Sequence, residues 1–205
     1  RYRQMMEEPV YTLIPRLAVP TIVSMLVTAV YNMADTYFVS QLGTSPSAAV
    51  GVVFSLMTGI QAVAFMIGMG CGNEIARLLG QKEVEEAERY VATGFFTEIL
   101  VGTLLAVLGI ACSGQLVYRL GATPTIAPYA ASYTRYALLG VPFFMCSLGM
   151  NNMLRFQGNS FYSMLGIATG GILNIFLDPL FIYVFHMGIA GAAIATVISQ
   201  IISFF

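Results

Sequence analysis

Charged side chains are scarce in this chain of 205 residues, where Asp, Glu, Lys and Arg together make up 9% of the sequence. Hydrophobic residues make up 58%, and the mean hydropathy is +0.79. A soluble domain needs a hydrated surface, and this balance does not provide one. The scarcity of charge therefore excludes an ordinary soluble protein and indicates an integral membrane protein.

Several familiar patterns are also missing. The three cysteines, Cys71, Cys112 and Cys146, are odd in number and lack CxxC or CxxH spacing, so we expect packing roles rather than a metal site or disulfides. The glycines of residues 68–72 follow no strand and lack a P-loop context, which argues against nucleotide binding. Strict alternation of apolar and polar residues is absent too, which argues against a membrane β-barrel.

The sequence contains long apolar runs instead. Six of them are near or above the roughly 20 residues that a membrane-spanning helix needs. They cover residues 10–39, 48–76, 90–112, 126–154, 161–185 and 187–205. We therefore expect an all-α integral membrane protein whose six transmembrane helices form one unit over residues 1–205.

Basic residues fall mainly on one side of this six-helix arrangement. Those on the favoured side are Arg1, Arg3, Arg16, Arg77, Lys82, Arg89 and Arg155. Arg119 falls on the other side, and Arg135 lies within the fourth helix. Because cytoplasmic loops are enriched in Lys and Arg, we predict a plasma-membrane protein with both termini in the cytoplasm. The acidic loop over residues 80–89 is expected to form a separate solvated helix.

Asp35 and Asp178 are the only two aspartates, and each lies within an apolar run. An ionised carboxylate in hydrocarbon costs several kcal/mol, so such residues persist mainly where they bind an ion, carry a proton or line a pathway. At about 1.5 Å per residue, they lie roughly 7 Å and 12 Å below the outer ends of their helices. Both carboxylates are thus expected in the outer leaflet.

Other polar residues are predicted at similar depths. Asn32 lies three residues before the first aspartate and Asn174 four before the second, so each pair shares a helix face. Tyr133 and Thr196 reach the same level from the fourth and sixth helices. Two neighbouring carboxylates need a proton or cation between them, so this cage suits H⁺ or a hard monovalent cation. Each of the four could instead serve only as a hydrogen-bonding contact between helices.

Prolines and one glutamate add further expectations. Pro20, Pro142 and Pro179 interrupt the first, fourth and fifth helices, and each removes a backbone hydrogen bond and favours a kink. Pro179 directly follows the second aspartate, so the backbone there should be irregular. Glu98 lies about 12 Å into the third helix and could face the interior of the bundle, with a functional or a packing role.

A set of motifs resembles the N-terminal half of multidrug and toxic compound extrusion (MATE) transporters, across essentially the whole chain. The motifs are Pro20, Asn32, Asp35 and Gly43; GQKEVEEA at 80–87; Arg155, Gly158 and Asn159 in RFQGN; NIFLDP at 174–179; and GAAIAT at 191–196. The resemblance implies one six-helix lobe of a twelve-helix antiporter. Such antiporters export organic, often cationic or amphipathic compounds in exchange for H⁺ or Na⁺.

The resemblance also implies which residues hold the coupling ion. The cation site of the family, with Na⁺ as one occupant, carries over to Asp35, Asn174, Asp178 and Thr196. Tyr133 and Asn151 match more loosely, and Asn151 is expected nearer the inner end of its helix. Pro20 matches the proline at which the first helix bends in some members.

The resemblance further implies which partners to expect. They are membrane lipid, a small-molecule substrate, and a second six-helix lobe outside this chain or another copy of it. No enzyme activity, nucleic acid or cofactor beyond the coupling ion is expected.

Two alternatives remain open from the sequence. A lipid-linked oligosaccharide flippase of the same wider superfamily would be expected to carry more basic residues within the membrane. An intramembrane aspartyl protease also needs two membrane aspartates. Such proteases carry a GxGD motif, whereas Ile175, Phe176 and Leu177 precede Asp178 here.

Overall fold

A computed structural model describes residues 9–204, which form helices joined by short turns, with no strand in that range. In chain order the helices are α2 (Val10–Ser40), α3 (Thr44–Gly80), α4 (Val84–Ala111), α5 (Ser113–Arg119), α6 (Ala127–Leu139), α7 (Val141–Phe156), α8 (Ser160–Pro179), the π-helix η1 (Leu180–Val184) and α9 (Gly188–Phe204). The all-α fold class predicted from the apolar runs is confirmed.

Four continuous helical stretches are long and apolar enough to cross a bilayer. The helices α2, α3 and α4 qualify by length and apolar composition, as does the continuous stretch Ser160–Val184 formed by α8 and η1. The helices α6 and α7 qualify together as one bent pair, and α9 is a shorter apolar helix of 17 residues. Five of the six expected segments thus qualify as spans, and α9 corresponds to the sixth but is shorter than a span needs.

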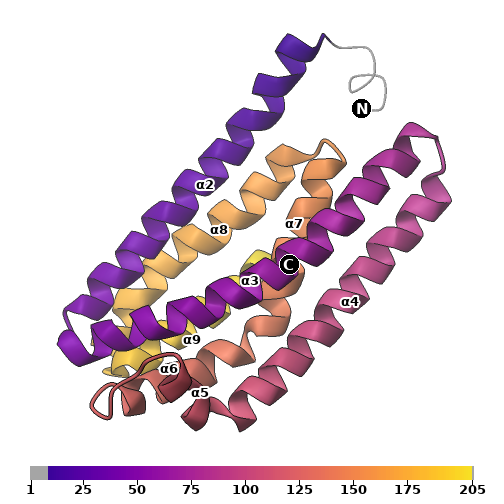
Figure 1. Cartoon of the computed structure of the whole chain (residues 1–205). Coiled ribbons are helices and arrows are strands. Elements are labelled where there is room, and N and C mark those ends of the chain that lie inside the picture. Colours follow the sequence, from indigo (N-terminus) through magenta and orange to yellow (C-terminus); the bar gives the residue numbers. More distant parts are fainter. Residues whose placement is uncertain (1–8, 205) are drawn as a thin grey trace.

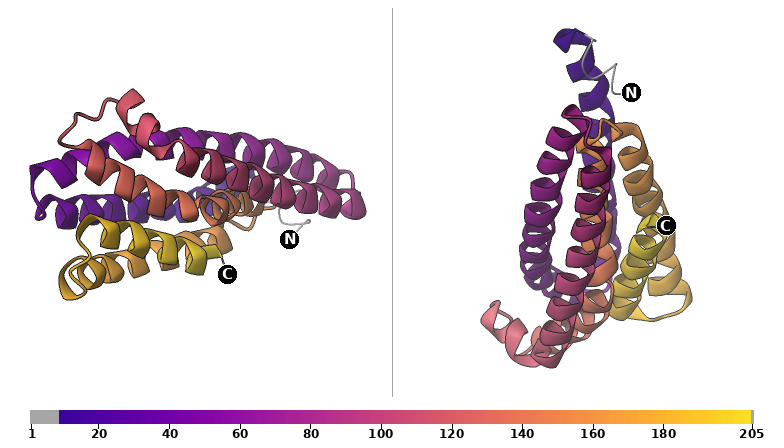
Figure 2. Two further views of the ribbon diagram at one scale, coloured as in Figure 1. Left: turned by 90° about the horizontal axis from the view of Figure 1, so that it is seen from below. Right: turned by 90° about the vertical axis from the view of Figure 1, so that its right-hand side faces the viewer.

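Two groups of helices form the edges of the bundle. On one edge α2 lies alongside α8, and on the other α3 and α4 lie side by side (Figure 1). Between them, α7 packs on α3 and α4, while α9 packs on α6 and α8 (Figures 1 and 2). The bundle therefore contains two different interhelical regions, one around α2 and α8 and one around α4 and α7.

The fourth expected segment is bent by 55° between α6 and α7. Pro142 has no N–H to donate, so the α-helical bond to the carbonyl four residues earlier is missing at this point. The bend also lies close to α9, because a Cβ on Gly140 would approach Val197 Cγ2 to 2.8 Å and Gln200 Oε1 to 3.0 Å. The missing side chain at Gly140 thus lets α9 cross the bend.

The backbone also changes winding directly after Asp178. The α-helix α8 ends at Pro179, and η1 follows with a wider turn. Its hydrogen bond runs from Phe185 N–H to the carbonyl of Leu180, five residues earlier, at 3.0 Å. The irregular backbone therefore begins one residue after the buried carboxylate.

Two expected loops are different in the structure. The separate helix expected over residues 80–89 is wrong, because α3 continues to Gly80 and α4 already begins at Val84. Glu85 and Glu86 lie in the first turn of α4, where the helix dipole favours negative charge, and they form ion pairs with Arg89 at 3.3 and 3.1 Å. The short helix α5 also forms inside the loop expected after residue 112. Two of the basic residues used for the topology prediction, at positions 1 and 3, lie outside the described residues.

Candidate functional site

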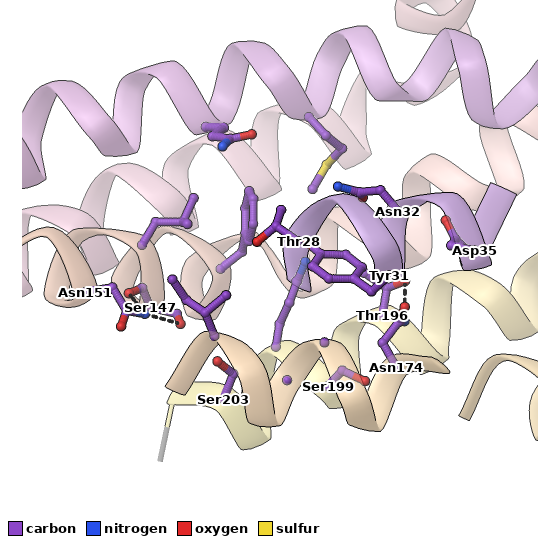
Figure 3. Close-up of a pocket in the computed structure, with 18 of the residues that line it drawn as sticks. Thr28, Tyr31, Asn32, Asp35, Ser147, Asn151, Asn174, Thr196, Ser199 and Ser203 are labelled. Atoms are coloured by element: carbon purple, nitrogen blue, oxygen red, sulfur yellow. Dashed lines mark hydrogen bonds between the residues drawn. The ribbon is translucent and has the colours of Figure 1, made fainter. Parts of the chain in front are cut away.

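A cavity of about 430 Å³ lies between α2, α3, α6, α7, α8 and α9. Asp35, Asn174 and Thr196 lie toward one end of it, and Ser147 and Asn151 lie toward the other (Figure 3). Apolar side chains such as phenylalanine, methionine and valine make up much of the wall between these ends. The cavity is thus an apolar chamber with distinct polar groups at its two ends.

The polar end is organised by one buried amide. Asn174 Nδ2 donates to Asp178 Oδ1 at 3.2 Å and to Thr196 Oγ1 at 3.3 Å. The Thr196 hydroxyl donates in turn to the carbonyl of Ala192 at 3.0 Å. Asp178 is 0% exposed and Asn174 is 3% exposed. The amide therefore connects the carboxylate of α8 to the hydroxyl of α9.

Three oxygens at this end are buried without a hydrogen-bond partner among the described residues. They are Asp35 Oδ1, Asn174 Oδ1 and Asp178 Oδ2. Asp35 lies within range of charge interaction with Asp178, and Tyr133 on α6 lies within range of both and near the Thr196 hydroxyl. Buried acceptors without donors are costly unless a proton or a cation satisfies them.

A glycine on α8 explains how α2 comes so close. A Cβ on Gly171 would approach Tyr31 Cδ1 to 2.9 Å and Val27 Cγ1 to 3.0 Å. Since glycine lacks this atom, α2 can pack directly on α8. Tyr31 is one helical turn before Asp35, so this contact holds the carboxylate of α2 at the level of the α8 cluster.

The structure brings together five of the residues predicted from the sequence: Asp35, Tyr133, Asn174, Asp178 and Thr196. Asn32 lines the cavity beside this cluster (Figure 3). Asn151 lies apart at the other end, where its Nδ2 donates to the carbonyl of Ser147 at 2.7 Å. This separation agrees with the expectation that Asn151 lies nearer the inner end of its helix, away from the other site residues.

The predicted bending prolines lie in different surroundings. The helix α2 continues through Pro20, whose carbonyl accepts a hydrogen bond from Ser24 Oγ at 2.8 Å. Pro179, in contrast, ends α8 and is followed by the π-helix. The irregular backbone thus lies at the α8 carboxylate, while α2 remains a single helix.

Two polar residues of the site were missed by the sequence analysis. Ser199 and Gln200 line the cavity from α9, and Ser199 Oγ and Gln200 Oε1 are buried without a partner in the described part of the chain. They follow Thr196 by three and four residues, so all three share one helix face. Polar residues at this spacing in an otherwise apolar helix would have identified them.

Glu98 does not face this cavity. It is 0% exposed and lies on α4 against Gly149 of α7, on the other side of the bundle from α2. Glu98 is therefore buried within the bundle, as the sequence allowed, but it lies in the contact between α4 and α7. Its surroundings are helix backbones and apolar side chains rather than the cavity.

The donor set at the polar end consists of carboxylate, amide and hydroxyl oxygens. Within residues 9–204 no group of three or more His, Cys, Asp and Glu side chains could hold a metal ion. Oxygen ligands suit hard cations and protons, whereas transition metals favour imidazole and thiolate. The donor set at this end is thus of the kind that suits H⁺ or a hard monovalent cation.

Residues 20–180 match the sequence profile of the MatE family. The multidrug export protein MepA of Staphylococcus saprophyticus is 25% identical over 187 residues, which are 91% of this chain and 42% of that protein. A protein of Shewanella oneidensis named FAD transporter is 27% identical over 203 residues, 97% of this chain and 45% of its own length.

A solved structure is similar over nearly the whole fold. A MOP superfamily transporter from Pyrococcus furiosus superposes with a TM-score of 0.92 at 32% sequence identity. The match covers 98% of this chain and 44% of that one. The chain therefore spans less than half the length of the relatives it matches.

Proposed function

This chain belongs to the MatE family, and on that premise we propose that it forms the cation-binding lobe of a secondary antiporter. The antiporter exports organic compounds across the cell membrane and takes up H⁺ or Na⁺ in exchange. Asp35 and Asp178 bind the coupling ion, with Asn174, Thr196 and Tyr133 completing the oxygen cage. Asn32, which lines the cavity beside this cage, takes part in coupling from α2.

One observation carries this proposal. Two acids from different helices lie within range of charge interaction, and each has a buried oxygen without a hydrogen-bond partner in residues 9–204. A purely structural pair would be expected to satisfy these oxygens with donors from neighbouring helices. The open acceptors support a site that alternates between a bound proton or cation and an empty state.

The substrate class follows from the cavity wall. Apolar side chains and uncharged polar groups form most of the lining, with Arg155 as the one basic residue among the described lining residues. Such a wall suits amphipathic organic molecules, and acids at one end favour a positive charge. The relatives named for multidrug export and for FAD transport differ in cargo, so the wall rather than the family supports this choice.

The alternatives receive less support. A flippase for lipid-linked oligosaccharides would need several basic groups for its phosphates, and the cavity wall offers one. Members of this family are transporters rather than enzymes, which disfavours an intramembrane protease. We therefore retain the antiporter as the proposed function.

The length of the chain relative to its relatives supports a second six-helix lobe as its partner. The chain spans 42% and 45% of the length of two relatives, and α2 exposes a long apolar surface away from α8. Its exposed residues include Ile14, Ile22, Met25, Leu26, Val30 and Met33. We propose that a second lobe, or another copy of this chain, packs near α2 and completes the substrate path within the lipid bilayer.

Both termini are proposed to face the cytoplasm of a plasma-membrane protein. Thr44 is the first residue of α3, and Glu83 lies in the turn that follows the other end of this helix. Cysteines placed at these two positions in a Cys112→Ser background should react with an impermeant thiol reagent from opposite sides of the membrane. Labelling of both from outside intact cells would overturn this topology.

Ion coupling is tested most directly by binding and transport in the same variants. Asp35→Asn and Asp178→Asn in the full natural chain should abolish Na⁺ or H⁺ binding and drug efflux, while the protein still folds. Asn151→Ala serves as a matched control, because it changes a cavity residue outside the cage. Normal efflux per folded molecule in both aspartate variants would overturn the proposed function.

A further inference from the structure

A third acid is buried in this lobe, and it does not line the cavity. Glu98 is 0% exposed, and both Oε1 and Oε2 lack a hydrogen-bond partner in the described part of the chain. It lies 14 residues after the start of α4 and 13 before its end, and is therefore near the middle of a membrane-spanning helix. Its position is thus as remote from water as any in α4.

The surrounding helices close tightly around this carboxyl. Gly149 of α7 faces it, and a Cβ there would approach Glu98 Cδ to 2.8 Å and Cγ to 3.0 Å. One turn away along α4, a Cβ on Gly102 would approach the Cα of Pro142 to 2.8 Å. One turn away in the other direction, a Cβ on Gly94 would approach Cys71 Sγ to 3.1 Å. Close packing on both sides, against the backbone of Pro142 and the side chain of Cys71, therefore excludes water from Glu98.

The facing helices offer no positive charge to this acid. The titratable groups that interact with Glu98 are the thiols of Cys71 on α3 and Cys146 on α7. Cys146 Sγ lies 3.9 Å from the carbonyl of Phe95, to which it donates a weak hydrogen bond. Arg77 of α3 pairs with Glu74, so it does not serve Glu98.

The remaining cations of the neighbouring helices also have other partners. Arg155 of α7 donates to Ser163 of α8 at 3.0 Å. Arg135 of α6 donates to Ser113 of α5 at 3.1 Å. Glu98 is therefore left with backbone, thiols and apolar side chains.

An ionised carboxylate does not persist in such surroundings. Removing the charge from water costs several kcal/mol, and here no donor or cation offsets that cost. A neutral carboxylic acid, in contrast, is tolerated between packed helices. The packing of α7 on α4 is thus compatible with only the protonated form of Glu98.

We propose that Glu98 is a second proton-binding site of this lobe, neutral while α7 packs on α4 and ionised once that contact opens. The site lies beside the bend of the fourth segment, because Pro142 contacts Gly102 one turn from Glu98. Proton binding at Glu98 therefore holds the α6 and α7 pair against α4. Raising the pH withdraws this proton and favours the open arrangement.

The protonation state can be measured without any transport. In the full natural chain carrying Asp35→Asn and Asp178→Asn, the infrared spectrum at neutral pH should contain a protonated carboxyl band that disappears on adding Glu98→Gln. Identical spectra with and without Glu98→Gln would overturn the proposal. Because this background already lacks the cage acids, the result does not depend on whether the cage drives transport.

The link to packing is tested by amide hydrogen exchange in α4 and α7. Relative to Glu98→Gln, the wild type should exchange faster around Gly149 as pH rises, by up to about tenfold per pH unit for one linked proton. The Gln variant has the same intrinsic exchange chemistry, so the ratio reports the proton alone. Glu98→Met removes the ionisable group in a different way and should match the Gln variant. An equal pH dependence in wild type and both variants would overturn the proposal.

Discussion

The two buried acidic regions of this lobe differ mainly in the groups that surround them. Around α2 and α8, two aspartates lie within range of charge interaction beside an amide, a threonine and a tyrosine, next to a cavity. Around α4 and α7, one glutamate is enclosed by glycines, thiols and backbone. The first region offers ligands and access, whereas the second offers neither.

This difference separates two uses of a membrane carboxylate. A carboxylate among oxygen ligands can hold a proton or a metal cation, because the ligands replace the water that the ion loses. A carboxylate in a dry helix contact can hold only a proton. Sodium dependence, if present, is therefore expected from the aspartate cage and not from Glu98.

The largest effect should come from removing a cage acid. Asp178→Asn keeps the size of the side chain but removes the charge that balances the cation, so efflux should fall to near background. Asp35→Asn should do the same. Drug efflux from proteoliposomes, divided by the amount of folded protein, measures this loss.

The corresponding substitution at the buried glutamate, Glu98→Gln, is expected to leave most transport intact. Efflux by Glu98→Gln at acidic pH should stay close to wild type, because the glutamate is already neutral in that range. If Glu98→Gln abolished efflux as completely as Asp178→Asn at every pH, the distinction between the two regions would be wrong.

A smaller effect is expected from disturbing the packing around Glu98. Gly149→Ala places a methyl group where the Glu98 side chain lies, and overpacking of this kind costs about 1–3 kcal/mol. Gly59→Ala is the matched control, since no atom lies within 4 Å of a Cβ there. Thermal unfolding in detergent should show a clear loss for Gly149→Ala and none for Gly59→Ala. Equal melting temperatures would contradict the close α4 to α7 contact.

A modest loss of cation affinity is expected when the threonine of the cage is changed. Thr196→Val removes a hydroxyl that accepts from Asn174, a loss of about 1 kcal/mol or a few-fold in cation affinity. Thr196→Ser retains the hydroxyl and should bind nearly as well as wild type. Isothermal titration with Na⁺, or proton uptake in unbuffered solution, can compare them. Equal affinities for the Val and Ser variants would show that this hydroxyl is not a ligand.

The smallest effect is expected at the other end of the cavity. Asn151→Ala removes a side chain that donates to the carbonyl of Ser147 and lies away from the cage. Its cation affinity should change by less than about twofold, because no ligand of the cage is altered. A loss of cation binding as large as that of Thr196→Val would place Asn151 in the coupling site after all.

The sequence predicted the acids of the site better than their surroundings. Asp35 and Asp178 were identified because charge in an apolar run is costly, and depth arithmetic placed them together. It could not show that Gly171 allows α2 to approach α8, because that contact joins segments far apart in the chain. It likewise missed the face of α9 formed by Ser199 and Gln200.

The helix boundary near residues 80–89 was not predicted correctly. The apolar runs stop where charged residues begin, so residues 80–89 were expected to form a separate helix outside the membrane segments. In the structure the acidic residues instead continue α4, since Glu85 and Glu86 stabilise its first turn and pair with Arg89. The bend at Gly140 was indicated by Pro142, but its 55° depends on the packing of α9.

The π-helix after Asp178 has a consequence for how this segment tolerates changes in length. A π-turn contains one residue more than the α-turn it replaces, so η1 holds a surplus residue next to the site. Deleting one residue within Leu180–Val184 could be absorbed by closing η1 into an α-helix, leaving Asp178 in place. An insertion of one residue within α8 before Asp178 cannot be absorbed in this way. It would rotate the carboxylate by about 100° away from Asp35. Sequence length should therefore be constrained before the carboxylate and permissive directly after it.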